Sequence, residues 1–351
     1  MSWITRLARP DIVALKAYEH ASWEPSLERL HANELPWRSL GDNSGAGLNR
    51  YPEPQPKVLM QRLAELYGVP ENSLLLGRGS DEAIDLLVRT FCRAGEDAVV
   101  VCPPTFGMYG VAARIQGADV VTVPLLAEQG FALDEQALLE KCTPRVKLVF
   151  LCSPNNPTGN LLSEETVLRI ARQLEGRALV VVDEAYVEFA NVESLARHVA
   201  RLPQLAVMRT LSKAYGLAGA RCGVLIANPE IIALLRKVIP PYAITQLTAE
   251  AVLRLLEPDP LSVMKHRIEL IRSERQRMAE AISALPNTIR VWPSDANFLL
   301  VEFHDADRVL ASTRAAGLLI RDVRSQPGLG RALRITIGTI DQNNRVLGAL
   351  K

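Results

Sequence analysis

The stretch VMRTLSKAYGLAGARCGVLIA, residues 207–227, places Lys213 in a loop between two apolar runs. The runs at 206–210 and 223–227 have the composition of buried strands, and the loop is rich in small residues. Burial disfavours the charged form of lysine, so lysine is uncommon at the edge of a core unless its amine is needed. We therefore expect Lys213 to be at least half-buried and functional; the alternative is an ordinary surface lysine.

Around this stretch, short apolar runs alternate with helical periodicity. Strands are expected at 73–76, 98–102, 120–123, 146–152, 178–183, 206–210 and 223–227, and helices at 56–67, 81–92, 133–141, 164–174, 194–202 and 229–238. Several apolar runs lack polar alternation, which is typical of strands covered on both faces. The pattern predicts an α/β fold with a mostly parallel, doubly wound sheet.

The pattern of predicted elements changes after about residue 245. A long charged helix is expected at 261–285, followed by strands at 297–303, 318–321 and 333–337 and a helix at 306–316. These elements predict a second, smaller α/β domain. We expect an N-terminal arm with part of the small domain at 1–45, a large domain at 46–245 and a small C-terminal domain at 246–351.

Composition excludes several classes of function. The 351-residue chain has a formal net charge of +1 and no long run of basic residues, which argues against a nucleic-acid or membrane partner. No apolar stretch approaches the ~20 residues that span a bilayer, and the N-terminus lacks a signal peptide, so a cytoplasmic location is expected. The five cysteines form no CxxC pair and are expected to be reduced core thiols. The five histidines have no metal-site spacing, so no metal is expected.

Polar residues follow two of the expected strands. GRGSDEAI, at 77–84, places Ser80 and Asp81 where a helix begins, and free N–H groups at such a terminus can hold a phosphate. CSPNNPTGN, at 152–160, presents the amides of Asn155 and Asn156. Taken alone, the segment at 77–84 is more simply explained as an ordinary helix start, and the segment at 152–160 as a proline-rich turn.

Two further strands end in the same way. DEAYVEF, at 183–189, puts Asp183 directly after apolar residues, where a carboxylate is costly unless it meets a cation, and Tyr186 follows three residues later. The opening stretch contributes Ser212, Lys213 and Arg221. Taken alone, Asp183 could be an ordinary helix cap and Lys213 an ordinary surface lysine.

Ligands of open α/β sheets bind at the carboxyl ends of strands, where all four groups are expected to meet. Together they would serve a cofactor with a phosphate, a ring nitrogen, a phenolic oxygen and an aldehyde. Pyridoxal 5′-phosphate (PLP) carries these groups. A dinucleotide-dependent dehydrogenase fits poorly, because Glu82 stands where the third glycine of GxGxxG is required and no acid ends the next strand.

The order NPTG, DEAY and TLSKAYGLAGARCG resembles the fold type I PLP-dependent aminotransferases, and the lysine segment resembles the class II attachment signature. The resemblance covers nearly the whole chain. Within it, NRYPEPQP at 49–56, GRGSDEAIDLLVRTFC at 77–92, CPPTFGMY at 102–109, LRITIGT at 333–339 and LHANELPW at 30–37 are similar to the histidinol-phosphate aminotransferase subgroup.

This resemblance implies roles around the cofactor ring. Lys213 forms the Schiff base and moves the proton, and Asp183 pairs with the ring nitrogen. Asn156 and Tyr186 bond the phenolic oxygen. Tyr109 is expected to stack on the ring, since Phe106 replaces a tyrosine found in many relatives.

The resemblance also implies how the phosphate is held. The amides of Ser80 and Asp81, the Ser212 hydroxyl and Arg221 bind it within one subunit. Tyr51 reaches the phosphate of the partner subunit, which implies a homodimer.

The implied substrates are L-histidinol phosphate and 2-oxoglutarate, with imidazole-acetol phosphate and glutamate as products, in histidine biosynthesis. Arg334 would bind the anionic end of each substrate, with Arg321 and Tyr18 as further phosphate-side contacts. An aromatic amino-acid aminotransferase or a threonine-phosphate decarboxylase of the same fold is the alternative. A PLP-binding transcription regulator is disfavoured, because the first ~45 residues show no helix-turn-helix pattern.

Overall fold

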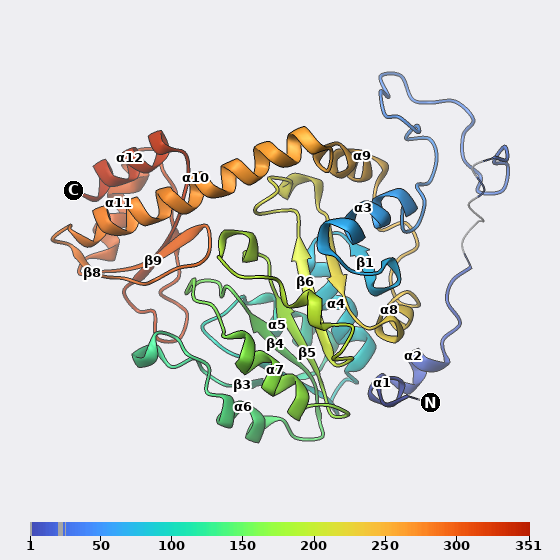
Figure 1. The fold of residues 1–351 in the computed structure, drawn as a ribbon, viewed down its shortest axis with the longest axis horizontal. Coiled ribbons are helices and arrows are strands. Elements are labelled where there is room, and N and C mark those ends of the chain that lie inside the picture. The colour runs from blue at the N-terminus through green and yellow to red at the C-terminus, as the bar shows by residue number, and fades with distance from the viewer. Residues whose placement is uncertain (1, 20–23, 25) are drawn as a thin grey trace.

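The computed structural model describes residues 2–19, 24 and 26–351. Its main feature is a seven-stranded sheet in the order β1-β7-β6-β5-β4-β2-β3 (Figure 1). The strands are β1 (Leu74–Gly77), β2 (Ala98–Val101), β3 (Asp119–Thr122), β4 (Val146–Cys152), β5 (Leu179–Asp183), β6 (Leu205–Thr210) and β7 (Gly223–Ile226). Neighbouring strands are parallel except that β7 is antiparallel to both β1 and β6. Each strand end lies within one residue of its predicted position.

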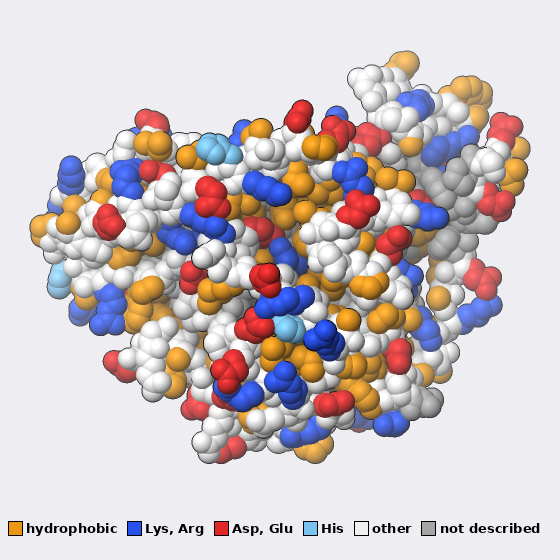
Figure 2. All heavy atoms as spheres, viewed as in Figure 1, with side chains coloured by type: hydrophobic (Ala, Val, Ile, Leu, Met, Phe, Trp, Pro, Cys, Tyr) orange, Lys and Arg blue, Asp and Glu red, His pale blue; other side chains and the backbone are white. Residues whose placement is uncertain are grey.

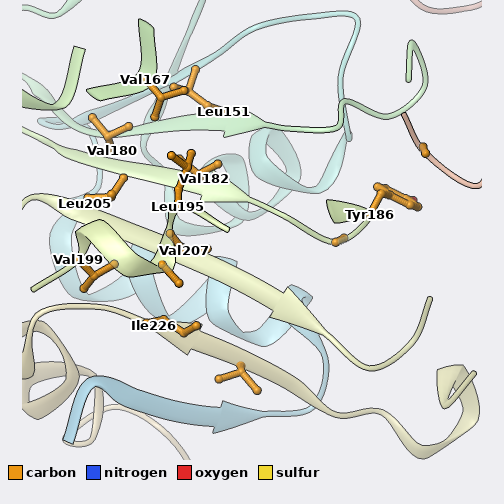
Figure 3. Close-up of a cluster of buried hydrophobic side chains, with 14 of the residues drawn as sticks. Leu151, Val167, Val180, Val182, Tyr186, Leu195, Val199, Leu205, Val207 and Ile226 are labelled. Atoms are coloured by element: carbon orange, nitrogen blue, oxygen red, sulfur yellow. The ribbon is translucent and has the colours of Figure 1, made fainter. Parts of the chain in front are cut away.

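Both faces of this sheet are buried except along the edge strand β3, as the continuous apolar runs predict. Along β5, Val180 and Val182 join one hydrophobic cluster while Leu179 and Val181 join another, because successive side chains point to opposite faces. Figure 3 shows Val180 and Val182 beside Val207 of β6 in the first cluster. Each buried side chain of this size contributes about 1.5–3 kcal/mol.

Helices cover the two faces separately. One face packs against α3 (Lys57–Tyr67), α6 (Glu135–Lys141), α7 (Glu164–Gln173) and α9 (Gln246–Leu255), and the other against α1 (Trp3–Leu7), α4 (Ser80–Phe91), α5 (Met108–Gln116) and α8 (Pro229–Leu235). This arrangement is the predicted doubly wound sheet. A short helix α2 (Pro10–Ala14) follows α1.

Several local expectations differ from the structure; among them, the strand expected at 318–321 is only β10 (Arg321–Asp322). The helix expected at 194–202 is only a 3₁₀ turn, η4 (Leu195–His198), and Pro203 disfavours a helical conformation for the residue before it. Conversely, α5 forms directly after a segment with two prolines, Pro103 and Pro104, where no helix is predicted.

The second sheet has four antiparallel strands in the order β10-β11-β9-β8. They are β8 (Thr288–Val291), β9 (Phe298–Phe303), β10 (Arg321–Asp322) and β11 (Ala332–Thr336). One face packs on α10 (Pro258–Ser283), α11 (Ala306–Ala315) and α12 (Ile340–Leu350). Phe298 and Leu300 on the other face join a cluster of the large sheet. The two sheets fall in the ranges expected for two domains, although the domain boundaries stay a prediction.

The N-terminal segment leaves the body of the protein as an arm at the opposite end from the small sheet (Figure 1). Within the arm, the side chain of Glu34 is 3% exposed and binds Arg29 at 2.7 Å and Arg50 at 3.0 Å. By contrast, the arm exposes large apolar side chains: Leu27, Leu30, Leu35, Trp37 and Leu40. An exposed apolar set of this kind is typical of a surface that contacts another chain.

Figure 2 shows basic and acidic side chains interspersed over the visible face of the molecule. Among the described residues, no helix combines the length and hydrophobicity needed to cross a membrane.

Candidate active site

A cavity of about 600 Å³ opens where the carboxyl ends of β4, β5 and β6 meet the small sheet. Every site residue predicted from the sequence lines it except Tyr18, Tyr51, Tyr109 and Asn155, and Asn155 is instead buried with its Nδ2 bonded to the Pro104 carbonyl at 2.8 Å. The predicted residues in its lining are Ser80, Asp81, Asn156, Asp183, Tyr186, Ser212, Lys213, Arg221, Arg321 and Arg334. Segments far apart in the sequence therefore converge on one site.

One end of the cavity is built to hold an anion. Helix α4 begins at Ser80 after Gly79, whose φ of 87° suits glycine. A Cβ on Gly223 would overlap the carbonyl carbon of Gly79, so β7 fits closely against this turn only without a side chain. Arg221 adds positive charge, with Nη1 3.3 Å from Ser212 Oγ and Nη2 3.4 Å from Asp81 Oδ2. The helix terminus and the guanidinium together favour a phosphate.

Lys213 lies in the loop between β6 and β7. The sequence predicts a buried or half-buried lysine, whereas the residue is exposed because its side chain faces the open cavity. Its Nζ lies 5.7 Å from the centroid of the Tyr186 ring. Desolvation and then the charge of Arg334 lower the pKa of Lys213, while Asp81 and Asp183 oppose this change. A lowered pKa raises the fraction of neutral, nucleophilic amine.

Asp183 ends β5 and is only 3% exposed. Its Oδ2 accepts a hydrogen bond from the Tyr109 hydroxyl at 2.7 Å, and its Oδ1 accepts one from the Ala185 N–H at 3.1 Å. Burial raises the pKa of Asp183 despite these bonds. A cation brought into the cavity would offset the desolvation and keep this carboxylate ionised.

Asn156 connects the two sheets. Its Nδ2 donates to the Tyr186 hydroxyl at 3.2 Å, and its Oδ1 accepts a hydrogen bond from Arg334 Nη1. Arg334 lies on β11, with its guanidinium 5.1 Å from the centroid of the Phe298 ring. Burial raises the pKa of the Tyr186 hydroxyl. The amide thus joins the group expected at the cofactor ring to the group expected at the substrate.

Two arginines stand side by side at the small-sheet end. Arg321 pairs with Arg334 in the register of β10 and β11. Burial, and after it the charge of Arg321, lowers the pKa of Arg334, whose Nε has no partner among the described residues. Two neighbouring guanidinium groups with spare donors favour a second anion at this end.

The prediction that Tyr109 stacks on a ring in the cavity is not supported. Tyr109 is fully buried on the inner face of α5 and stacks on Phe150 at a centroid distance of 4.9 Å. Its hydroxyl donates a hydrogen bond to Asp183. Phe106 lines the cavity instead. Phe106 lies between β2 and α5, whereas Tyr109 lies within α5, a helix that was not predicted from the sequence.

The other two tyrosines lie outside this cavity. Tyr51 stacks on Tyr242 at 4.6 Å, and Tyr18 is 73% exposed beside a separate cavity of about 550 Å³. Their predicted roles therefore require either a second subunit or a different position of the arm.

The sequence did not single out some residues of the site. Cys152 and Gln326 both line the cavity. Burial raises the pKa of the Cys152 thiol, which keeps it unreactive. Cys152 could have been found from its place at the end of β4, whereas no local pattern marks Gln326.

Comparisons with known proteins agree with this geometry. The family model "Aminotransferase class I and II" matches residues 25–350. A histidinol-phosphate aminotransferase of Stenotrophomonas maltophilia is 47% identical over 99% of this chain and 96% of its own length. One from Xanthomonas euvesicatoria is 47% identical over 100% and 97%. A crystal structure of histidinol-phosphate aminotransferase from Sinorhizobium meliloti in complex with pyridoxal-5′-phosphate is 27% identical, with a TM-score of 0.78 over 86% of this chain and 82% of that one.

Proposed function

The chain belongs to the class I and II aminotransferase family, as its motifs predict, and we propose that it is a PLP-dependent histidinol-phosphate aminotransferase. In this proposal it transfers the amine of L-histidinol phosphate to 2-oxoglutarate, in histidine biosynthesis. The observation that carries the proposal is the convergence of an anion site, an amine, a buried carboxylate and two arginines in one cavity. The full-length relatives at 47% identity support the choice of substrate.

The residues present fit the cofactor. The start of α4 and Arg221 would hold its phosphate. Burial disfavours the ionised form of Asp183, and a protonated ring nitrogen beside it would offset that cost. The Tyr186 hydroxyl and Asn156 amide would bind its phenolic oxygen. When bound, PLP supplies an aldehyde for the amines and an electron-accepting ring.

The protein's own groups have distinct tasks in this proposal. Lys213 lies on a loop whose two ends are both in the sheet, and its neutral amine would hold the aldehyde end of the cofactor and would also accept and release a proton at Nζ. Asp183 would hold a proton on the ring nitrogen, because a fixed carboxylate beside that nitrogen favours its charged form, and preorganised charges of this kind are usually the largest contribution to catalysis. Arg334 orients the substrate, because a planar guanidinium binds carboxylate and phosphate alike.

A homodimer is part of the proposal. Tyr51 lies outside the cavity of its own subunit, on a segment that follows an arm with exposed apolar side chains. A second copy would cover these side chains and bring its own Tyr51 to the site. The cytoplasmic location and the lack of a nucleic-acid partner stay predictions.

A panel of amino donors tests the proposed function. PLP-loaded protein is mixed with histidinol phosphate, phenylalanine or threonine phosphate, and the visible spectrum, glutamate formation from 2-oxoglutarate and CO₂ release are followed. We expect loss of the visible band and fastest glutamate formation with histidinol phosphate, without CO₂. Faster turnover of phenylalanine, or CO₂ from threonine phosphate, would replace the proposal with one of its two alternatives.

A further inference from the structure

A charged cluster lies buried among α3, β6 and the segment that follows β5. It consists of Arg209, Glu184, Glu188 and Tyr67, and we call it the Arg209 cluster. Arg209 Nη2 is 2.6 Å from Glu188 Oε1, Arg209 Nη1 is 3.5 Å from Glu184 Oε2, and the guanidinium is 4.7 Å from the centroid of the Tyr67 ring. The side chains of Arg209 and the two glutamates are at most 10% exposed.

The cluster joins the two chain segments that carry the proposed chemistry. Glu184 directly follows Asp183 at the end of β5, and Arg209 on β6 precedes Lys213 by four residues. Glu184 also fixes the next turn, since it accepts hydrogen bonds from the Leu195 N–H at 2.7 Å and from a serine hydroxyl. The backbones of the two segments pair, with the Glu184 N–H donating to the Met208 carbonyl at 3.0 Å, and Arg209 adds a direct side-chain link between them.

Further contacts extend this link on both sides. Burial and then the Glu188 carboxylate raise the pKa of the Tyr215 hydroxyl, two residues after Lys213. Arg272 of α10 donates to the carbonyl oxygens of Glu188 at 2.9 Å and Phe189 at 3.2 Å. The long helix thus holds the same short turn, η3 (Val187–Phe189), that faces the Arg209 cluster.

Stability alone is a poor explanation for this cluster. Desolvation of buried ion pairs consumes most of their attraction, and well-packed apolar residues of similar size are often as stable. Arg209 Nε and the Tyr67 hydroxyl also have no hydrogen-bond partner among the described residues. An apolar contact would avoid these costs, but it would not fix direction as a guanidinium between two carboxylates does.

We propose that Arg209 is a positioning residue, which holds the Lys213 loop against the segment bearing Asp183 by binding Glu184 and Glu188 together. The inference rests on the proposed role of Lys213 but not on the identity of the substrate.

The test uses the protonation of Lys213 itself. Its amine is faced by Asp81 and Asp183, which favour the charged form, and by Arg221 and Arg334, which disfavour it. Desolvation is the largest influence and lowers the pKa. A loosened loop would move the amine toward water, so its pKa would rise. At a pH below the midpoint, a pKa higher by one lowers the neutral fraction, and with it the rate of acylation, about tenfold.

The experiment measures acylation of Lys213 in the cofactor-free full chain over a pH series, by mass spectrometry of the peptide. The variants are Arg209→Met and the milder Glu188→Gln, which preserves shape and retains an acceptor. Arg145→Met is the matched control, because Arg145 is half-exposed and pairs with Asp119 at the far edge of the sheet. Melting temperature is recorded for every variant.

We expect the midpoint of Lys213 labelling to rise in Arg209→Met, to rise less in Glu188→Gln and to stay unchanged in Arg145→Met. A fall in melting temperature with an unchanged midpoint in Glu188→Gln would show a merely structural cluster and overturn the proposal, whether or not Arg209→Met folds. The donor panel leaves this result unaffected, so failure of the proposed substrate is distinguishable from failure of this inference.

Discussion

The two sheets contribute to the cavity in different ways. The seven-stranded sheet supplies Asp183 from the end of β5 and supplies Asn156 and Lys213 from the turns that follow β4 and β6. The four-stranded sheet supplies Arg321 and Arg334 from within paired strands. The first set is placed by local strand-to-turn junctions, whereas the second depends on how one sheet packs against the other. We therefore expect the first set to govern the chemistry and the second to govern affinity.

The largest expected effect is that of Lys213→Ala, which removes the amine from the large sheet. Turnover should fall by about 10³-fold or more, since proton transfer by a positioned group alone contributes about 10²–10⁴-fold. The visible absorbance of lysine-bound PLP should also disappear. Steady-state assays and spectra measure both effects, with the exposed Lys265→Ala of α10 as control. Normal turnover of Lys213→Ala would contradict the expectation that residues of the large sheet carry out the chemical step.

Asp183→Asn should cost about 10²–10³-fold in kcat, because a fixed charge aimed at the reacting group is worth about 3–4 kcal/mol. The isosteric amide preserves an acceptor for the Tyr109 hydroxyl, so the fold should remain. Kinetics at saturating PLP and substrate measure the loss. An increase in KM with kcat unchanged would show that Asp183 governs affinity, which contradicts the expected difference between the two sheets.

Arg334→Lys tests the small sheet. Lysine keeps the charge but loses the planar pair of donors, so KM for histidinol phosphate should rise about 10–100-fold while kcat falls much less, since hydrogen bonds to charged groups are worth about 1.5–3 kcal/mol. Initial rates over a range of substrate concentrations separate the two constants. A loss confined to kcat would show that Arg334 acts in the chemical step, which contradicts the expectation that the small sheet governs affinity.

The smallest effect concerns the stability of cofactor-free protein. Burial raises the pKa of Asp183 above its ordinary value of 3.8, so between 3.8 and the raised value the folded chain keeps a proton that the unfolded chain has lost. The free energy of unfolding should therefore fall as pH rises through this window, by about 1.4 kcal/mol for each pH unit that the window spans, and stay lowered above it. Denaturant unfolding of wild type and Asp183→Asn over pH should show this fall in the wild type alone.

The large sheet could be predicted closely because its strands are continuous apolar runs with two buried faces. The smaller elements were harder. The two-residue strand β10 and the strand β8, with exposed Ile289 and Arg290, carry no comparable apolar pattern, and β8 was not predicted. Helix α5 was not predicted; Pro103 and Pro104 precede its first residue, Met108, and so do not interrupt its hydrogen bonds.

The same division applies to the site. Asp183 and Lys213 could be found because charged residues beside apolar runs are costly and therefore conspicuous. The contact between Asn156 and Arg334 could not, since it joins residues 178 positions apart through the packing of two sheets. Tyr109 was misplaced because the sequence does not show which face of α5 is buried.

The antiparallel pairing of β6 and β7 has a consequence for selectivity. Thr210 and Gly223 are paired, so the loop carrying Lys213 and Arg221 is closed at its base. If Lys213 and Arg221 have their proposed roles, the span between the aldehyde site and the phosphate site is thereby set by the connection between β6 and β7. A carbonyl compound whose phosphate lies nearer to or farther from its aldehyde would contact only Lys213 or only Arg221. The loop would therefore select cofactors by the distance between these two groups.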